Sequence, residues 1–173
     1  RGAVFKSSSG ELYFGGTSGY NVFHPDSIRV NTNRPQVYIT SFHLDQERIY
    51  FDQPVYELET IHLKHRENIF SLGFVALNYS NSHKNNYRYM LEGFEDVWTF
   101  CGTTREVRYT NIDPGRYTFY VRGSNNDGLW NTSPASIQIV IHPPWYRTFL
   151  AYVGVLILAL VSFLGFFSWR PRR

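Results

Sequence analysis

Residues 87–92 read Tyr-Arg-Tyr-Met-Leu-Glu, and every second position carries a large apolar or aromatic side chain. Successive side chains of a β-strand point to opposite faces, so Tyr87, Tyr89 and Leu91 share one face. We expect this face to lie in a core, because two aromatic rings together bury a large apolar area. The same alternation in residues 116–122 predicts a second core strand.

Period-two patterns continue on both sides of these two strands. Further strands are predicted at residues 37–42, 61–63, 69–74, 105–109 and 137–141. Turn sequences, among them Asp113-Pro114-Gly115 and Asn125-Asn126-Asp127-Gly128, separate them. About seven short strands over roughly a hundred residues are typical of an immunoglobulin-like or fibronectin-type β-sandwich. We therefore predict an all-β chain whose main domain, residues 37–142, is such a sandwich.

Residues 1–24 show a separate pattern of short strands joined by Gly/Ser turns. The strands are expected at 3–6, 11–14 and 20–23. A meander of this size is marginally stable alone, so we expect it to be the remnant of a final β-propeller blade. Residues 25–36 contain Pro25 and Pro35 and are predicted to form a linker.

Residues 149–169 form an apolar run without one charged side chain. A helix of this length spans about the 30 Å hydrocarbon core of a bilayer. Three arginines follow within 170–173, whereas Arg147 is the single cation close before the run. The apolar run therefore predicts a transmembrane helix at 147–169. The excess of cations after it predicts a periplasmic segment 1–146 and a cytoplasmic C-terminus in a bacterial inner membrane. The alternative is a buried core helix, which at this length normally carries a polar stripe.

Charge and cysteine content limit the class of protein. The chain has 17 Lys and Arg and 14 Asp and Glu, and three of the arginines follow the apolar run, which leaves 14 of each sign elsewhere. This balance argues against a nucleic-acid partner, which needs a basic face on the folded domain. Cys101 is the only cysteine, so no intrachain disulfide can form, and a bacterial periplasm is favoured over an extracellular animal protein.

Three segments together resemble one known family. Residues 87–98 resemble the opening of the Y_Y_Y domain, residues 108–119 its middle and residues 124–130 its end. Residues 10–25 are similar to the closing repeat of the propeller that precedes this domain in the family. The signature positions, which we also expect to be core or edge residues, are Tyr87, Tyr89, Leu91, Gly93, Trp98, Tyr109, Gly115, Tyr117, Asn125, Asp127, Gly128 and Trp130.

In that family, the propeller, the sandwich and one membrane span form the periplasmic sensor of a hybrid two-component histidine kinase, typical of carbohydrate-responsive gut Bacteroidetes. The resemblance implies that the parent protein is a histidine kinase that feeds a phosphorelay and controls transcription. It also implies a homodimer of the parent and an oligosaccharide ligand bound by propeller domains outside this sequence.

No catalytic, cofactor-binding or metal-binding pattern is predicted, and the fragment itself is expected not to be an enzyme. His62 and His65 stand three positions apart, which on a strand points them to opposite faces and prevents shared metal ligation. Glu95-Asp96 has no second acidic pair of the kind a glycosidase needs, and we interpret it as a turn with solvated charges.

The predicted role is therefore mechanical. The sandwich would pass a change in geometry to the membrane helix through the stiff Pro143-Pro144 joint. Two alternatives stay open. One is a membrane-anchored carbohydrate-binding or adhesion module with a sugar platform on Trp98 or Trp130, and the other is the sensor of a membrane-bound one-component transcription regulator whose DNA-binding domain follows Arg173.

Overall fold

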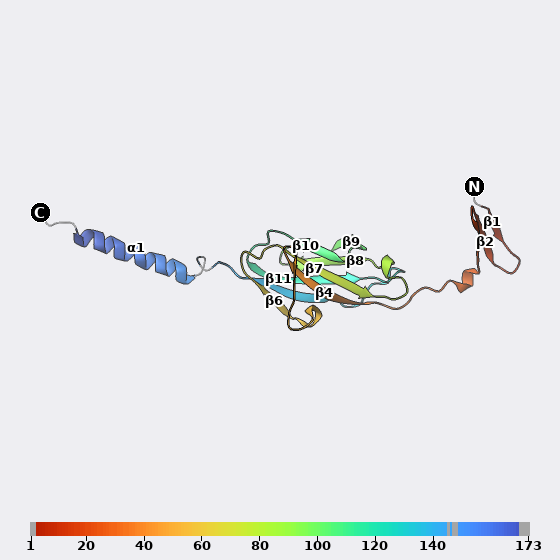
Figure 1. The fold of residues 1–173 in the computed structure, drawn as a ribbon, viewed down its shortest axis with the longest axis horizontal. Helices are drawn as coiled ribbons and strands as arrows, with labels where there is room; N and C mark the ends of the chain where they lie inside the picture. Colours follow the sequence, from red (N-terminus) through yellow and green to blue (C-terminus); the bar gives the residue numbers. More distant parts are fainter. Residues whose placement is uncertain (1–2, 145, 147–148, 170–173) are drawn as a thin grey trace. The chain divides into compact units, whose positions relative to one another are not determined.

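The structure is a computed structural model that describes residues 3–144, 146 and 149–169, with the helix side chains described at 151–165. It divides into two compact units, Arg1–Asn33 and Arg34–Arg173. Three strands lie in the first unit and nine in the second. The chain is mostly β-sheet, as the sequence predicts (Figure 1).

The first unit is an antiparallel meander of β1 (Val4–Lys6), β2 (Leu12–Gly16) and β3 (Gly19–Phe23). Gly16 pairs with Gly19 across a two-residue turn, and the stacked rings of Phe14 and Phe23 lie 5.7 Å apart. None of the described residues 3–33 is buried. The meander therefore has aromatic side chains but no core of its own.

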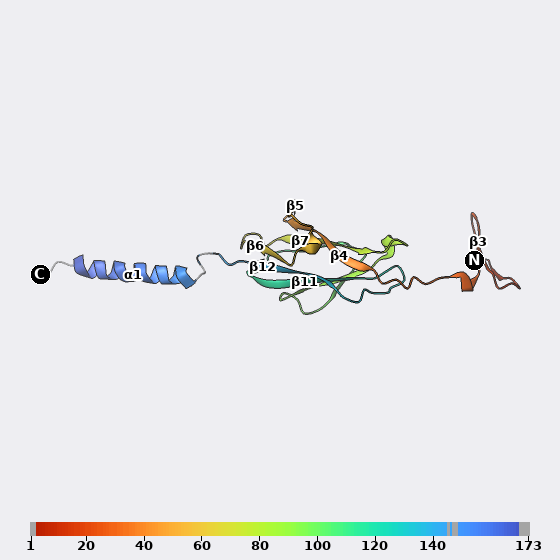
Figure 2. The same ribbon diagram turned by 90° about the horizontal axis from the view of Figure 1, so that it is seen from below.

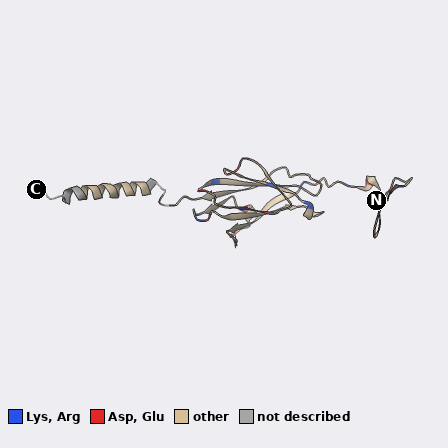
Figure 3. Ribbon diagram, turned by 90° about the horizontal axis from the view of Figure 1, so that it is seen from above, with Lys and Arg blue, Asp and Glu red and all other residues tan. Residues whose placement is uncertain are grey.

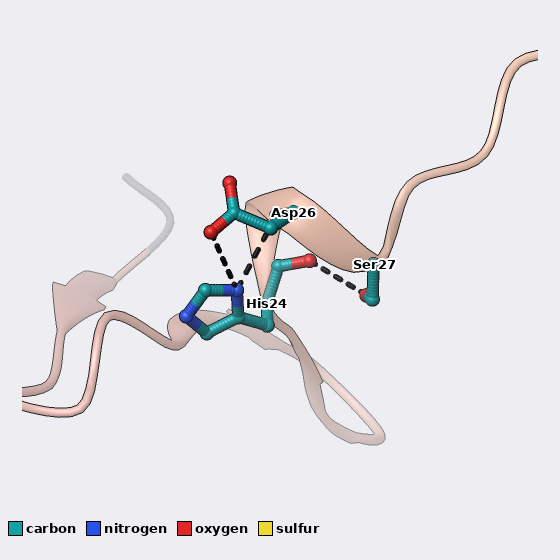
Figure 4. A network of polar contacts seen from close by, with 3 residues as sticks. All are labelled: His24, Asp26 and Ser27. Atoms are coloured by element: carbon teal, nitrogen blue, oxygen red, sulfur yellow. Dashed lines mark hydrogen bonds and ion pairs between the residues drawn. The ribbon is translucent and has the colours of Figure 1, made fainter.

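A 3-10 turn, η1 (Pro25–Ser27), follows β3 and is held by His24 (Figure 4). The Nδ1 atom of His24 accepts a hydrogen bond from the backbone N–H of Asp26 at 3.3 Å, and the Ser27 hydroxyl donates to the His24 carbonyl at 2.6 Å. The same Nδ1 lies 3.5 Å from the Asp26 carboxylate. These contacts hold the short turn that follows β3.

The second unit is a β-sandwich of two facing sheets (Figures 1 and 2). One sheet has four strands in the order β10 (Glu106–Tyr109), β7 (Phe70–Leu77), β4 (Gln36–Leu44) and β5 (Glu47–Ile49). The other has five, in the order β6 (Thr60–Leu63), β12 (Ala135–Ile141), β11 (Gly115–Gly123), β8 (Tyr87–Glu92) and β9 (Thr99–Gly102). Two 3-10 turns, η2 (Val55–Glu57) and η3 (Ser82–Lys84), lie in the connections.

Strand pairing is antiparallel in both sheets except between β12 and β6, which run parallel with Val140 opposite His62. This parallel pair makes β12, the last strand, an interior strand with neighbours on both sides. The strands β5 and β9 were not predicted from the sequence. Both are short and lie at sheet edges, where an alternating apolar pattern is not required.

The core lies between the two sheets and is built from aromatic and branched aliphatic side chains. The ring of Phe74 on β7 packs against Tyr87 at 5.3 Å and Phe119 at 6.2 Å in the facing sheet. The Tyr87 hydroxyl also accepts a hydrogen bond from the backbone N–H of Ala76 at 3.1 Å. The largest fully buried side chains include Phe42, Phe70, Phe74, Tyr87, Phe119, Leu72 and Leu91.

Tyr117 closes one end of this core. Its hydroxyl donates to the Asp113 carbonyl at 2.9 Å, four residues upstream, in the manner of the tyrosine corner of β-sandwich domains. The ring passes directly over two glycines: a Cβ at Gly93 would lie 3.2 Å from Cδ1, and one at Gly115 would lie 3.0 Å from the hydroxyl oxygen. Gly93 also has φ +94°, so glycine is required there on both grounds.

The helix α1 (Phe149–Trp169) follows the sandwich in the sequence. Its described residues are uncharged (Figure 3). Most of their side chains are exposed. Within the described part of the chain, no helix meets the length and apolarity required to cross a membrane. The flanking residues that carry the orientation signal, Arg147 and 170–173, lie outside the described residues. The transmembrane helix at 147–169 thus stays a prediction.

Candidate functional site

The outer face of the five-stranded sheet carries alternating tryptophan and arginine side chains, Trp130, Arg88, Trp98 and Arg122, which we call the Trp–Arg ladder. Arg88 on β8 and Arg122 on β11 stand directly opposite each other in the strand register. They point outward because the core residues alternate with them along both strands. The two tryptophans come from the segments that follow these strands.

The ladder is assembled by cation–π contacts. The Cζ atom of Arg88 lies 4.8 Å from the Trp130 ring centroid and 5.3 Å from that of Trp98, and Cζ of Arg122 lies 5.5 Å from Trp98. All are within the roughly 6 Å over which a ring attracts a cation. Like charges directly opposite on a sheet repel each other. An indole that contacts both cations offsets that repulsion.

Neither ladder arginine has a carboxylate partner in the described part of the chain, where the ion pairs involve other residues. The Nε atoms of both are buried and make no hydrogen bond within those residues. Stacking occupies the faces of a guanidinium group, whereas its donors lie in its plane. Among the described residues, the two cations are therefore positioned by their contacts with the indole rings.

The ladder is tied to the residue at which the chain enters the sandwich. The Nη1 atom of Arg34 donates to the Trp130 carbonyl at 2.9 Å. Arg34 lies two residues before β4, and Trp130 forms an isolated bridge with Ser124 just after β11. The start of the first sandwich strand is thus joined to the outer face of the opposite sheet.

Asparagine side chains fix the loops at the same end. Asn85, which is fully buried, accepts from Asn78 Nδ2 at 2.8 Å and donates to the Ala76 carbonyl at 3.1 Å. Oδ1 of Asn131 accepts from the Gly123 N–H at 3.2 Å. Because buried amides with satisfied partners favour one loop conformation, these hydrogen bonds restrain the loops at this end of the domain.

Asn125 organises the turn 125–128 that the sequence singles out. Its Oδ1 accepts from the backbone N–H groups of Asp127 at 3.0 Å and Leu129 at 2.9 Å. Gly128 has φ +82°, which favours glycine. This segment is a turn stabilised by the Asn125 side chain, whose oxygen is used within the turn.

The structure divides the signature positions among different places. Tyr87, Leu91, Tyr109, Tyr117 and Asn125 are buried, Tyr89, Trp98, Gly115 and Trp130 are half-buried, and Gly93, Asp127 and Gly128 are exposed. They do not form one site. Trp98 and Trp130 come together only through Arg88, a residue that the sequence analysis did not select. The available signal was an arginine directly beside a core residue on each of two predicted strands.

Glu95 was interpreted as a solvated charge, and this was wrong. Its Oε1 accepts hydrogen bonds from the backbone N–H of Leu91 and from the Tyr109 hydroxyl, both at 2.9 Å. Burial, reinforced by the hydrogen bond and the negative charge of Glu95, raises the pKa of Tyr109. Glu95 is a structural acceptor that closes the β8–β9 turn, whereas Asp96 is exposed.

A metal centre of three or more ligands and a reactive cysteine both lack support in the described residues. They include no cluster of three or more His, Cys, Asp and Glu side chains placed for a metal ion. The Cys101 thiol donates to the Tyr87 carbonyl at 3.4 Å, and burial raises its pKa, so it is held as a thiol rather than a reactive thiolate. His65 lies beyond the end of β6, away from the strand position of His62.

One shallow hollow, of about 410 Å³, lies beside β5 and η2. Tyr50 and Tyr56 line it, with exposed fractions of 82% and 53%. The Tyr56 ring is held edge-on by Tyr38 at 5.5 Å, and Cζ of Arg48 lies 5.5 Å from the Tyr50 ring centroid. These rings are a more open aromatic surface than the ladder tryptophans, whose faces contact arginines.

The chain is similar to several known proteins. Residues 78–142 match the family described as the Y_Y_Y domain. Over 166 residues the chain is 34% identical to Histidine kinase P4 of Formosa agariphila. The aligned region covers 88% of this chain and 12% of that protein. The chain therefore corresponds to a small part of that relative.

Two solved structures are similar to most of this chain. The extracellular domain of BT3049 from B. thetaiotaomicron, assigned to the hybrid two component systems, is 29% identical with a TM-score of 0.69, over 82% of this chain and 20% of that one. That of BT4673 from the same organism is 25% identical with a TM-score of 0.60, over 82% and 20%. BT4673 is described as a one component system there and as a hybrid two component system in a second structure. Residues 78–142 therefore match the Y_Y_Y domain, and the chain is similar to a small part of a histidine kinase and to parts of the extracellular domains of two-component systems.

Proposed function

We propose that this segment is the periplasmic signal-transmitting part of a two-component sensor. In this proposal it couples ligand sensing by propeller domains before it to a cytoplasmic histidine kinase after it. The observation that carries the proposal is a sandwich fixed at the end where the chain enters and followed, after β12, by Pro143-Pro144 and the uncharged helix α1. A domain built in this way can move as one body.

Stiffness where the chain enters the sandwich supports this role. The Arg34–Trp130 hydrogen bond and the ladder join the first strand to the opposite sheet, and the buried Asn78–Asn85 pair fixes the adjoining loop. A displacement of the chain before Arg34 would therefore move the sandwich rather than be absorbed by loose loops. In this proposal the Trp–Arg ladder holds the neighbouring segments in place and has no catalytic role.

Signalling further needs two arrangements that a ligand can distinguish. We propose that the parent is a homodimer, in which two sandwiches change their separation or angle and move two membrane helices at 147–169. The ligand in this proposal is an oligosaccharide bound outside this segment. The identity of Histidine kinase P4 as a relative supports the kinase output.

The decisive experiment changes the joint between sandwich and helix. In the full-length parent, Pro143-Pro144 is replaced by a flexible Gly/Ser segment of about ten residues. We expect ligand binding to be retained and the transcriptional response to fall, because the two prolines fix φ and resist bending. The matched control carries the same insert in the exposed loop between Asp52 and Gln53. An undiminished response with the flexible joint would contradict rigid coupling and leave ligand-driven proximity of two helices.

The membrane topology is tested separately with reporter fusions. A reporter after Arg173 is expected to behave as cytoplasmic, and one at His142 as periplasmic, because the cations follow the apolar run. A periplasmic reading at Arg173 would contradict the span and with it the whole proposal.

The hollow beside Tyr50 and Tyr56 favours a second candidate, a carbohydrate-binding module. Calorimetry of residues 34–142 with plant and host glycans tests it, with Tyr50→Ala and Tyr56→Ala as variants and Tyr79→Ala, an exposed tyrosine elsewhere, as the control. Micromolar binding lost in the first two variants alone would favour this candidate. Weak or absent binding is the result expected for a transmitting domain.

A further inference from the structure

Two histidines that are distant in sequence meet on the outer face where β12 ends. Nδ1 of His62 lies 3.1 Å from Nε2 of His142, and both side chains are exposed. The ring centroids are 5.3 Å apart and the ring planes differ by 20°. That centroid distance is about the nitrogen–nitrogen distance plus two ring radii. The rings therefore meet edge to edge, with one ring nitrogen of each facing the other.

The backbone beneath this pair is fixed before any ligand binds. Val140 is opposite His62 in the parallel β6–β12 register, so His142, two residues further on, lies on the same face. The His142 N–H donates to the Leu63 carbonyl at 2.8 Å, and the Gln138 N–H donates to the Glu59 carbonyl at 2.9 Å. The backbone that carries the two histidines is thus hydrogen-bonded between β6 and β12 and continues to be paired at His142.

The spacing of the two nitrogens suits a transition-metal cation. Zn–N bonds of about 2.0–2.1 Å place two imidazole nitrogens about 2.9 Å apart at a right angle and about 3.3 Å apart in a tetrahedron. The observed 3.1 Å lies between these values. In the metal-free pair one nitrogen donates its proton to the other. When that proton moves to the remote nitrogen of its own ring, both facing nitrogens present lone pairs.

We propose that His62 and His142 form a chelating site for a divalent transition-metal cation such as Zn²⁺, Ni²⁺ or Cu²⁺. Neutral imidazole is a preferred ligand of these ions. Because the two facing nitrogens point at each other, each ring turns by roughly 40° to direct its lone pair to a common point about 2.0–2.1 Å from both nitrogens. Water completes the coordination in a single chain. A bound ion clamps β6 to the last residue before Pro143-Pro144. The site is independent of the proposed signalling function, since it concerns binding alone.

The test is a titration of the full chain, residues 1–173, in detergent micelles after treatment with a chelator. Isothermal calorimetry with ZnCl₂ is expected to show one ion per chain. His62→Gln and His142→Gln are each expected to weaken the affinity by at least about tenfold, about 1.4 kcal/mol. His65→Gln is the matched control, because this histidine is near in sequence and outside the pair, and it is expected to keep the full affinity.

A second measurement locates the ion directly. Addition of ZnCl₂ is expected to shift the imidazole C–H resonances of His62 and His142 in the proton NMR spectrum and to leave those of His65 and His83 unchanged. Circular dichroism confirms that the variants are folded. Absence of measurable Zn²⁺ and Cu²⁺ binding, or affinity that is unchanged in His62→Gln, would overturn the proposal.

Discussion

The inner and outer faces of β8 are stabilised by different interactions, although their side chains alternate along the same six residues. Tyr87 and Leu91 on the inner face are fully buried among rings from the facing sheet. Arg88 on the outer face is held between two indoles without a carboxylate partner among the described contacts. The inner face supplies the free energy of folding, because burial of apolar area dominates it. The contacts on the outer face instead fix the segments that follow β8 and β11, without burying much apolar area.

The largest effect is expected from deleting a ring on the inner face. Tyr117→Ala should lower the free energy of unfolding by about 3–5 kcal/mol, since a large aromatic side chain leaves a cavity. Urea unfolding of residues 34–142 measures it. The paired variant Tyr117→Phe keeps the ring, loses only the hydrogen bond to Asp113, and should cost about 0.5–1.5 kcal/mol. A loss below about 0.5 kcal/mol for Tyr117→Ala would mean that the ring is not part of the core.

A smaller effect is expected at the buried polar rim of the inner face. Asn85→Ala removes a donor to the Ala76 carbonyl and an acceptor for Asn78, so it should cost about 1–3 kcal/mol. Asn81→Ala is the matched control, because that side chain is exposed and makes no cap hydrogen bond. Equal stability of the two variants would show that the loop is not fixed by its amide network.

On the outer face, Trp98→Ala should cost about 1–2 kcal/mol, because it removes two cation–π contacts of about 0.5–1 kcal/mol each and leaves Arg88 facing Arg122. Phe100→Ala serves as the control, since Phe100 is opposite Arg88 but 64% exposed. It should change the unfolding free energy by less than about 0.5 kcal/mol. A loss for Trp98→Ala as large as that of Tyr117→Ala would erase the distinction between the faces.

The effect of Tyr109→Phe is distinguished by its pH dependence, which appears in alkali. The pKa of Tyr109 is raised above its usual value of 10.0 by burial and by Glu95. A raised folded-state pKa means stability that is fully present below pH 10 and is lost as the pH rises further. Between about pH 8 and about pH 11, the urea midpoint of unfolding should therefore fall less in Tyr109→Phe than in the unchanged domain. An identical fall would show that Tyr109 ionises freely.

Much of the inner face could be predicted because period-two alternation is a local signal. The runs around Tyr87 and Tyr117 have it, and these residues lie between the sheets. The ladder could not be predicted in the same way, because Trp98 and Trp130 reach Arg88 from segments before and after other strands. Glu95 was misjudged for a related reason: its partner Tyr109 is supplied by another strand. The His62–His142 contact depends on a parallel register between residues 80 positions apart, which the local pattern does not encode.

The interior position of β12 has a mechanical consequence. A pull on the chain at His142 runs along β12, which is hydrogen-bonded to β11 on one side and to β6 on the other. The load is therefore shared by two ladders in shear, and many hydrogen bonds must break at once. A terminal strand at a sheet edge would be held by one such ladder. Tension from the C-terminal side is thus resisted by two sets of backbone hydrogen bonds.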